Sequence, residues 1–480
     1  MVYLTALFLL TTSLNAQDYG LVSSENASYD GQDLILSGHV VIDHILGKMQ
    51  ARKALLKRQE KTNFPFNQIE LDQEVLILLK EHGRITADRA EFDLQKYQGV
   101  LSSNQEKNVT YQDMIYDKRE KLIPFTIEGR SLELKLLSKE EKSREYLVDS
   151  ICAKQNVAIS YANVFFLTAV KATYNQLDLI NQWKGCISAY GQDSNNNCCL
   201  THEQDIVHAR QIDINLIDSY LQLFYAKGVL QSFLLPKSEK SALCFSTDSL
   251  NWNDLEKKLL FKGPTQIEEQ DLGIIRTQDE LTIKNCIINN KVVFQTLDAK
   301  GHTLMTYKDL QGHNHRIESH GRLYIDQNKL QAWIESPQDQ DGNIQNQLHY
   351  ETESLNVFSD SAQLDYININ QHVKPSSIVL KEHVRLLSKD PNKPAQLAIA
   401  DKMSYSLDTH SIILSAHPGK KVLFWDALQE LKISAPEVHI TTDCLTQEKV
   451  IKGIGRVQFA FSKEEQTQFN QYFPQLASHE

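Results

Sequence analysis

Short runs of alternating apolar and polar residues recur along the chain. The run 34–42 places four aliphatic side chains on one face: Leu34, Leu36, Val40 and Ile42. Residues 321–325 and 330–334 form two further runs on either side of the polar segment 326–329. A period of two is typical of half-buried strands, and two such runs around a short polar turn indicate a β-hairpin. Because long helical periodicity is nearly absent, the pattern predicts an all-β protein.

A longer pattern repeats at intervals of about 40 residues. Each copy has an apolar residue, a spacer, a small residue, two polar spacers, an aliphatic residue, a spacer and a bulky apolar residue. Residues 85–92 (ITADRAEF) and 398–405 (AIADKMSY) fit it closely. The small residues of nine copies are Ala51, Ala87, Gly129, Ala169, Ala209, Thr247, Ser359, Ala400 and Ala435. Their successive gaps are 36, 42, 40, 40, 38, 112, 41 and 35, and the longest gap has room for degenerate copies near 278–283 and 320–325.

The spacing inside each copy predicts a bend. Two apolar pairs with strand spacing are separated by a step of three, which breaks the alternation that a straight strand requires. A bulge or corner restores the alternation and turns the strand. Corners at a fixed interval describe repeating units in which a sheet folds over on itself along one long axis. Several glycines before the next strand suit tight bends between layers: Gly38, Gly99, Gly228, Gly263 and Gly453.

Carboxylates recur directly after the small residue, as Asp88, Asp248, Asp360 and Asp401. Recurrence at one repeat position indicates a structural role at the corner, such as capping a turn. A catalytic pair would not need to recur, and no activating constellation of nucleophile and base is present. We therefore do not expect an enzyme. The enzymatic alternative is a parallel β-helix that cleaves polysaccharides, which would require convergent carboxylates or a basic residue in a cleft.

Three segments interrupt the repeats, and a fourth follows them. Residues 138–144 are a charged run expected to form a solvated turn, and residues 185–205 are expected to form a polar loop. Residues 336–347 are the strongest linker candidate, and residues 462–480 predict a short helix or a loose tail. The expected organisation is a signal peptide (1–16), an N-terminal repeat array (17–335), a C-terminal repeat region (348–462) and a tail (463–480).

The first residues favour export. Residues 3–14 are mostly apolar, and residues 15–18 are then polar. This apolar run is too short to span a bilayer but has the length of a signal-peptide core, so we expect cleavage near Ala16. The alternative is a buried N-terminal strand. The first cysteine is Cys152, so the mature N-terminus has no cysteine that could be lipid-modified, and no later stretch is long and apolar enough for a transmembrane helix.

Composition adds limits on the chemistry. The chain has 480 residues, 41% of them hydrophobic, and a net charge of −11, which argues against general nucleic-acid binding. Seven cysteines leave at least one without an intrachain partner. Cys198, Cys199 and His202 match no standard zinc spacing, and a flexible loop is the preferred interpretation. We expect no metal and no cofactor, and interpret a histidine cluster as surface residues flanking a turn: His302, His313, His315 and His320.

Several segments resemble the OstA-like family of lipopolysaccharide-transport proteins, which includes LptA, LptC and the N-terminal domain of LptD. The matching segments are 27–29 (ASY) with 34–40 (LILSGHV), 85–92, 400–405 and 452–457 (KGIGRV). The resemblance is strongest over residues 24–101 and 396–462. It implies an elongated, V-shaped β-jellyroll whose apolar groove holds acyl chains and whose copies join end to end. The chain departs from the family in being far longer than one bridge subunit.

The resemblance and the alternation together predict a periplasmic lipid-binding protein, exported or associated with the outer membrane, that takes part in lipopolysaccharide transport. The expected ligand is lipopolysaccharide or a related lipid, and the expected partners are other OstA-like proteins that pair through end strands. The alternative is a structural β-repeat scaffold or surface protein without lipid transfer. The candidate groove residues, including those of a supposed final strand, are Leu34, Leu36, Val40, Ile42, Leu323, Ile325, Val457, Phe459 and Phe461.

Overall fold

The computed structural model describes residues 21–473 except 45, 59–65, 81–82, 105, 117–121, 139–145, 163, 179–183, 193–196, 203, 218–219, 235–242, 254, 270–272, 289–290, 310–311, 340–343, 370–371, 389–394 and 443–448. Strands make up 75% of the structure, and one helix of 10 residues is present in the described part. The all-β prediction is therefore confirmed. The predicted signal peptide and the charged run, apart from Ser138, lie outside the described residues.

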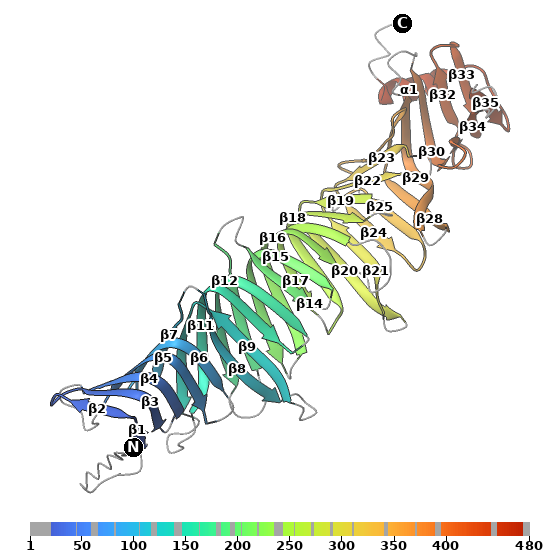
Figure 1. Ribbon diagram of the computed structural model, residues 1–480. Coiled ribbons are helices and arrows are strands. Elements are labelled where there is room, and N and C mark those ends of the chain that lie inside the picture. The colour runs from blue at the N-terminus through green and yellow to red at the C-terminus, as the bar shows by residue number, and fades with distance from the viewer. Residues whose placement is uncertain are drawn as a thin grey trace. The chain divides into compact units, whose positions relative to one another are not determined.

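The chain divides into two compact units (Figure 1). Unit 1 comprises residues 1–232 and 251–255, and unit 2 comprises residues 233–250 and 256–480. The proposed linker, residues 336–347, lies within unit 2 between two of its strands.

The strands of unit 1 are β1 (Val22–Ser23), β2 (Asn26–Tyr29), β3 (Leu34–His44), β4 (Gly47–Lys57), β5 (Gln68–Leu79), β6 (Arg84–Asp93), β7 (Gln98–Ser102), β8 (Val109–Tyr116), β9 (Leu122–Gly129), β10 (Ser131–Ser138), β11 (Tyr146–Tyr161), β12 (Phe165–Asp178), β13 (Lys184–Tyr190), β14 (Cys198–His202) and β15 (Asp205–Ile217). The strands β16 (Tyr220–Leu234) and β17 (Leu243–Asn253) have residues in both units. Because β13 and β14 occupy much of 185–205, the prediction of a polar loop there is wrong.

The further elements of unit 2 are β18 (Lys258–Glu269), β19 (Gly273–Thr277), β20 (Glu280–Ile288), β21 (Lys291–Lys300), β22 (Thr303–Lys308), β23 (Asn314–Ser319), β24 (Arg322–Asp326), β25 (Gln331–Glu335), β26 (Leu348–Glu351), β27 (Leu355–Ser359), β28 (Ser361–Ile369), β29 (His372–Ser388), β30 (Gln396–Ser406), β31 (Ser411–Ser415), β32 (Val422–Asp426), β33 (Leu431–Ala435), β34 (Glu437–Thr442), β35 (Lys449–Ile454) and α1 (Lys463–Tyr472). Helix α1 confirms the predicted short helix in the tail, over residues 463–472.

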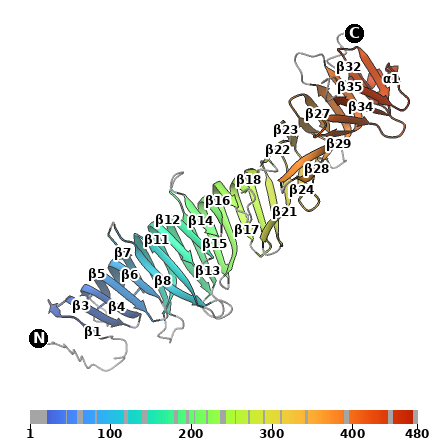
Figure 2. The same ribbon diagram turned by 45° about the vertical axis from the view of Figure 1, so that its right-hand side comes forward.

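Unit 1 is a sheet folded into two walls. Wall A contains β2, β7, β10 and β13, and wall B contains β1, β8, β9 and β14. Longer strands cross between the walls, so that one half of each pairs in wall A and the other half in wall B. For β12, residues 165–168 pair with β14, whereas residues 171–178 pair with β13. Figure 2 shows these strands following one another side by side along the unit.

Unit 2 has the same construction. Wall C is the series β19, β22, β23, β26 and β27, followed by one half of β29 and of β30 and then by β32 and β33. Wall D is the series β20, β21, β24, β25 and β28, the other halves of β29 and β30, and then β31, β34 and β35. Every described pairing is antiparallel, which excludes the parallel β-helix for this part of the chain.

The line where the two walls of a unit meet, here called the corner, is marked by a break in strand register. Between β11 and β12 the pairing shifts at Lys154 and Val157, so Gln155 and Asn156 face only Val170. Both facing residues have positive φ, 60° and 52°, as expected where a strand turns sharply. Other crossing strands break at the corner in the same way, between Ser37 and Val40, Asp72 and Val75, and Lys381 and Val384.

The predicted bend of the sequence repeat is confirmed at these breaks. The lone facing residue directly follows a small residue of the repeat, as Val170 follows Ala169 and Asp401 follows Ala400. The two degenerate copies also lie at the corner, where Gly263 N–H donates to Asp279 O and Gly301 N–H donates to Gly321 O, each at 2.8 Å. One interval of about 40 residues is therefore one circuit of the walls, with two crossings of the corner in opposite directions.

Aspartates cap the backbone at the corner, as the sequence predicts for two of them. Asp88 Oδ2 accepts a hydrogen bond from Asn104 N–H at 2.8 Å. Asp401 Oδ2 accepts one from His417 N–H at 2.7 Å. Both bonds satisfy amide groups that the broken ladder leaves without a strand partner.

Buried hydroxyl groups satisfy further corner carbonyls in unit 2. Ser319 Oγ donates to Glu335 O at 2.7 Å, and Thr265 Oγ1 donates to Gly263 O at 2.9 Å. Gly263 itself has φ +79°, and a Cβ there would lie 2.7 Å from Asp248 Oδ2. At Gly263 the corner therefore has no room for a side chain, and the neighbouring hydroxyl bonds directly to its backbone.

Helix α1 covers the outer face of wall C. Ser462 and Glu465 form a capping box at its N-terminus. Phe469 and Phe473 pack on an outward-facing cluster of β30 and β32, which consists of Leu397, Ile399 and Leu423. Both faces of β30 are consequently buried at this place, which explains the four consecutive buried residues 397–400.

Overpacking the corner should destabilise unit 2. Ala400 is 4% exposed and is followed by the register break, so Ala400→Leu should lower the free energy of unfolding by about 1–3 kcal/mol. Ala27→Leu, at an exposed position of β2, is the matched control and should change it by no more than about 0.5 kcal/mol. Chemical denaturation of both variants measures the difference. Equal stability of the two variants would contradict the steric role of Ala400.

Candidate lipid-binding interior

Most of the predicted groove residues lie between the walls. Leu36, Val40 and Ile42 on β3 are 1–3% exposed, and Leu323 and Ile325 on β24 are each 1% exposed. Leu34 is only partly buried. Burial between walls is compatible with a groove and with an ordinary core, so the assignment of these residues to lipid stays a prediction.

The predicted final strand is wrong. The last strand, β35, ends at Ile454, and only an isolated bridge between Ser434 and Gln458 follows it in the described residues. Phe459 is 72% exposed, so it does not line a buried interior. Phe461 packs instead on the outer cluster beside α1, and Val457 lies half-buried against Gly453. The alternation of 456–461 was misleading because the segment passes outside the walls before the helix begins.

Side chains fill the space between the walls of unit 1. Aromatic rings gather at the side away from the corner, which we call the mouth. Phe125 on β9 in wall B lies with its ring centroid 5.0 Å from that of Tyr174, on the wall A half of β12. Phe125 also contacts Tyr111 and Tyr161, at 6.5 and 6.2 Å. The two walls therefore touch directly at the mouth, and these rings close the interior.

The mouth of unit 2 is closed by tyrosine and histidine. Tyr350 in wall C lies 6.4 Å from Tyr405 in wall D, and His315 stacks at 6.0 Å on Tyr350. The His315 side chain is 1% exposed, so its assignment to the surface is wrong. The signal that could have revealed this is the alternation, which continues through His315 and places it on the inward face of β23. Burial lowers the pKa of His315 below its usual value, so the ring is neutral at pH 7.

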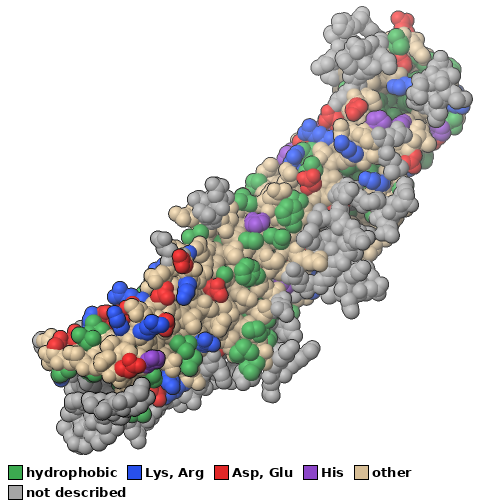
Figure 3. Space-filling model, viewed as in Figure 1, with side chains coloured by type: hydrophobic (Ala, Val, Ile, Leu, Met, Phe, Trp, Pro, Cys, Tyr) green, Lys and Arg blue, Asp and Glu red, His purple; other side chains and the backbone are tan. Residues whose placement is uncertain are grey.

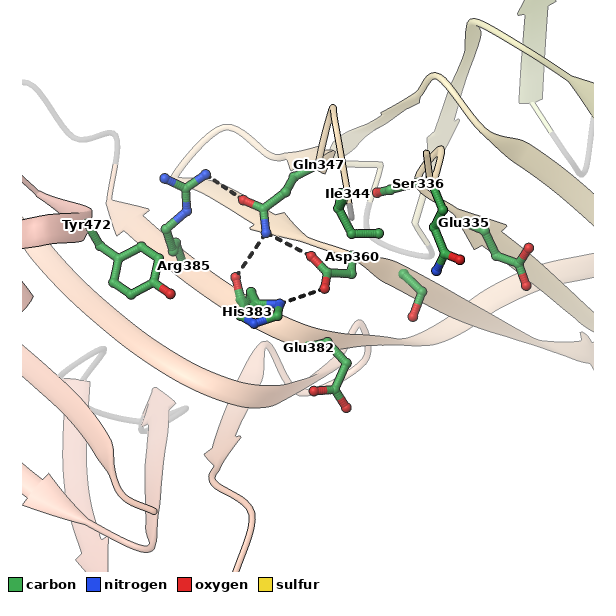
Figure 4. Close-up of a pocket in the computed structure, with 11 residues that line it drawn as sticks. Glu335, Ser336, Ile344, Gln347, Asp360, Glu382, His383, Arg385 and Tyr472 are labelled. Atoms are coloured by element: carbon green, nitrogen blue, oxygen red, sulfur yellow. Dashed lines mark hydrogen bonds and ion pairs between the residues drawn. The ribbon is translucent and has the colours of Figure 1, made fainter. Parts of the chain in front are cut away.

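A polar cavity of about 1020 Å³ lies at the corner of unit 2 (Figure 4). The guanidinium of Arg385 donates to Gln347, whose amide donates at 2.9 Å to Asp360. His383 Nδ1 lies 2.7 Å from the other oxygen of Asp360. These side chains bind one another, and Arg385 also lies against the ring of Tyr472 of α1, so the cavity presents mainly polar groups to an occupant. The sequence predicts Gln347 only as part of a linker.

The paired cysteines do not form a metal site. Cys198 and Cys199 are consecutive residues of β14, so their side chains point to opposite faces of the sheet. Cys198 is fully buried at the corner, and burial raises the pKa of its thiol to about 12. The expected flexible loop is wrong for residues 198–202, which form a strand. The described thiols that are not in disulfides are Cys152, Cys186, Cys198, Cys199 and Cys244.

The outer surface is mixed in character. On the face shown in Figure 3, hydrophobic side chains are interspersed with charged and other polar ones. Within the described ranges, no helix has the length and apolar character needed to cross a membrane.

Comparison with known proteins gives a structural resemblance to solved structures. No protein-family model matches the chain, and no curated protein matches it. A similar solved structure is LptH, the LptA homologous periplasmic component of the lipopolysaccharide transport device of Pseudomonas aeruginosa. The alignment has 9% sequence identity and a TM-score of 0.24, and it covers 31% of this chain and 94% of LptH. A TM-score of this size carries no argument, so the fold rests on the strand pairings described above.

Removing a ring from the mouth of unit 1 should destabilise it. Phe125 is 1% exposed, and Phe125→Ala should lower the free energy of unfolding by about 3–5 kcal/mol. The control is Phe166→Ala, since Phe166 lies on the outer face of β12 and is 47% exposed. There the free energy of unfolding should fall by about 1 kcal/mol or less. Denaturant titration compares the two variants. A loss at Phe166 as large as that at Phe125 would show that the rings do not hold the walls together.

Proposed function

We propose that the protein is a lipid-binding protein of the cell envelope that holds acyl chains between its two β walls and takes part in lipopolysaccharide transport. In this proposal it is exported to the periplasm. Its ligand is lipopolysaccharide or a related lipid, and its partners are other two-walled proteins of the same kind that pair with its end strands.

The observation that carries the proposal is the apolar interior that follows the strands through each unit. Inward-facing positions of successive strands are aliphatic or aromatic, as with Ile127, Ile159 and Leu167 in unit 1. Among the described residues, the backbone joins the walls of each unit along the corner and nowhere else. An interior of this kind can admit an acyl chain when the walls part at the mouth, and each CH₂ buried there contributes about 0.8 kcal/mol.

Entry of an acyl chain has a physical requirement. The rings that join the walls at the mouth have to move aside, because the interior is filled without ligand. Ring contacts such as Phe125 with Tyr174 contribute about 0.5–1.5 kcal/mol each beyond their buried area. A lipid with several long acyl chains buries enough CH₂ groups to replace several contacts of this size. The proposal therefore favours a multiply acylated lipid over a single fatty acid.

The second candidate function is a structural scaffold of the cell envelope. The direct contact of the walls favours it, since Phe125, Tyr161 and Tyr350 are at most 1% exposed and fill the mouth as a sealed core would. The two functions differ in what lies beside an inward-facing side chain in the cell. In a transport protein the neighbour is at times a lipid, whereas in a scaffold it is always protein.

Photo-crosslinking in cells separates the two functions. A photoreactive amino acid at Leu36 in unit 1 or at Leu323 in unit 2 should capture lipid, because both side chains face the interior. The matched controls are Ile35, which is 50% exposed on the same strand as Leu36, and Tyr324, which neighbours Leu323 on the opposite face. Phe459, 72% exposed outside the walls, is a third control. Capture confined to the inward positions supports lipid binding. Protein adducts alone at Leu36 and Leu323, in folded protein, would leave the scaffold.

A further inference from the structure

Metal-ligand side chains from both walls of unit 2 converge at its mouth. Asp309 and His313 lie between β22 and β23 of wall C. His410 lies between β30 and β31, at the mouth end of wall D. The possible ligand atoms of these three residues all lie within 4.8 Å of one another. The rings of His313 and His410 are 5.1 Å apart and meet edge to face across the mouth.

The carboxylate of Asp309 is held in place by its neighbours. Its side chain is 0% exposed, and its Oδ1 accepts a hydrogen bond of 2.9 Å from His313 N–H. Its Oδ2 lies 3.2 Å from His313 Nδ1 and 3.2 Å from His315 Nε2. Tyr350 approaches the other nitrogen of His315, Nδ1, at 2.8 Å, an arrangement in which the ring can donate from Nε2 to the carboxylate. A buried carboxylate fixed in this way is held in position to bind a cation.

His410 is oriented in the same manner. Its Nδ1 lies 2.8 Å from the hydroxyl oxygen of Tyr405. The ring can therefore donate its Nδ1 proton to that oxygen and present Nε2 as a ligand. Metal-binding histidines almost always hydrogen-bond through their second nitrogen, which fixes the tautomer and the ring orientation. His315 and Tyr405 therefore occupy the supporting positions around a metal site.

We propose that Asp309, His313 and His410 bind a divalent transition-metal ion, with Zn²⁺ the best fit, and that this ion joins wall C to wall D. Two imidazoles and one carboxylate are common zinc ligands, and three protein ligands leave a fourth position for water. Ca²⁺ and Mg²⁺ prefer sites made of oxygen alone, which this site is not. The proposal does not depend on the lipid-binding function.

Two other clusters in the described residues have similar ligand types but a different electrostatic setting. In the cluster of His302, Glu318 and His320, the carboxylate of Glu318 already pairs with Arg316 at 2.7 Å. In the cluster of Glu382, Asp401 and His417, the carboxylate of Asp401 pairs with Lys420 at 3.3 Å. A neighbouring cation competes directly with a metal ion for these oxygens. Asp309 differs in that its side chain is fully buried and its carboxylate lies beside two histidines, His313 and His315, which favours a metal ion at its cluster.

Titration of the full chain, stripped of metal with a chelator, tests the site. The wild type should bind one Zn²⁺ tightly by isothermal titration calorimetry, and Co²⁺ should give the intense visible bands of a tetrahedral site. His313→Ala and His410→Ala should each weaken binding by about 100-fold or more, and Tyr405→Phe by about 10-fold. His320→Ala, from the competing cluster, is the control and should leave the affinity unchanged. Absence of tight Zn²⁺ binding by the wild type would overturn the proposal.

The joining of the walls needs its own readout. The side chains of His313 and His410 are only partly buried, so both alanine variants should fold. Circular dichroism without metal checks this. Zn²⁺ should raise the melting temperature of the wild type and of His320→Ala but not that of His410→Ala. If His410→Ala bound Zn²⁺ as tightly as the wild type, the ion would lie on wall C alone. This result would contradict the link between the walls.

Discussion

The whole structure depends on turning a sheet through a corner without leaving buried backbone groups unpaired. Each crossing breaks the ladder, as between Lys154 and Val157, and the backbone groups released there need partners close to the bend. Small residues such as Ala169 and Ala400, capping aspartates and buried hydroxyls meet this need. Because every circuit meets the same constraint, the sequence carries a repeat of about 40 residues, and the two walls come to enclose one apolar interior in each unit.

The side of each unit away from the corner is held differently. At the corner the walls share backbone, whereas at the mouth the described residues join them through side chains: Phe125 and Tyr174 in unit 1, and Tyr350 and Tyr405 in unit 2. Side-chain contacts can open and close while the sheets remain intact. The mouth is therefore the natural place for a ligand to enter, and a metal ion bound by Asp309, His313 and His410 would oppose that opening in unit 2. Lipid entry and metal binding would then act on the same contacts in opposite senses.

The fold could be predicted from the sequence to the extent that it is local. Alternation revealed the strands, and the off-phase step after Ala87 or Ala400 revealed the corner, because a step of three breaks the alternation that a straight strand requires. What depends on distant contacts could not be predicted. Phe461 alternates like a strand residue but packs beside α1, whose position no short segment encodes. The metal-ligand cluster was missed because His410 belongs to the other wall, and no spacing in the sequence relates it to Asp309 and His313. Cys198 and Cys199 suggested a site, but strand geometry turns them apart.

Native mass spectrometry of the mature protein, released from the envelope of an exporting host in mild detergent, tests the central claim that the interior admits acyl chains. The account predicts a folded species whose mass exceeds that of the chain by one or more lipid molecules, which collisional activation or organic solvent releases for identification. It also predicts that the released lipid is multiply acylated. A folded protein that carries only its own mass, from a host rich in envelope lipid, would contradict the account and identify the interior as a sealed core.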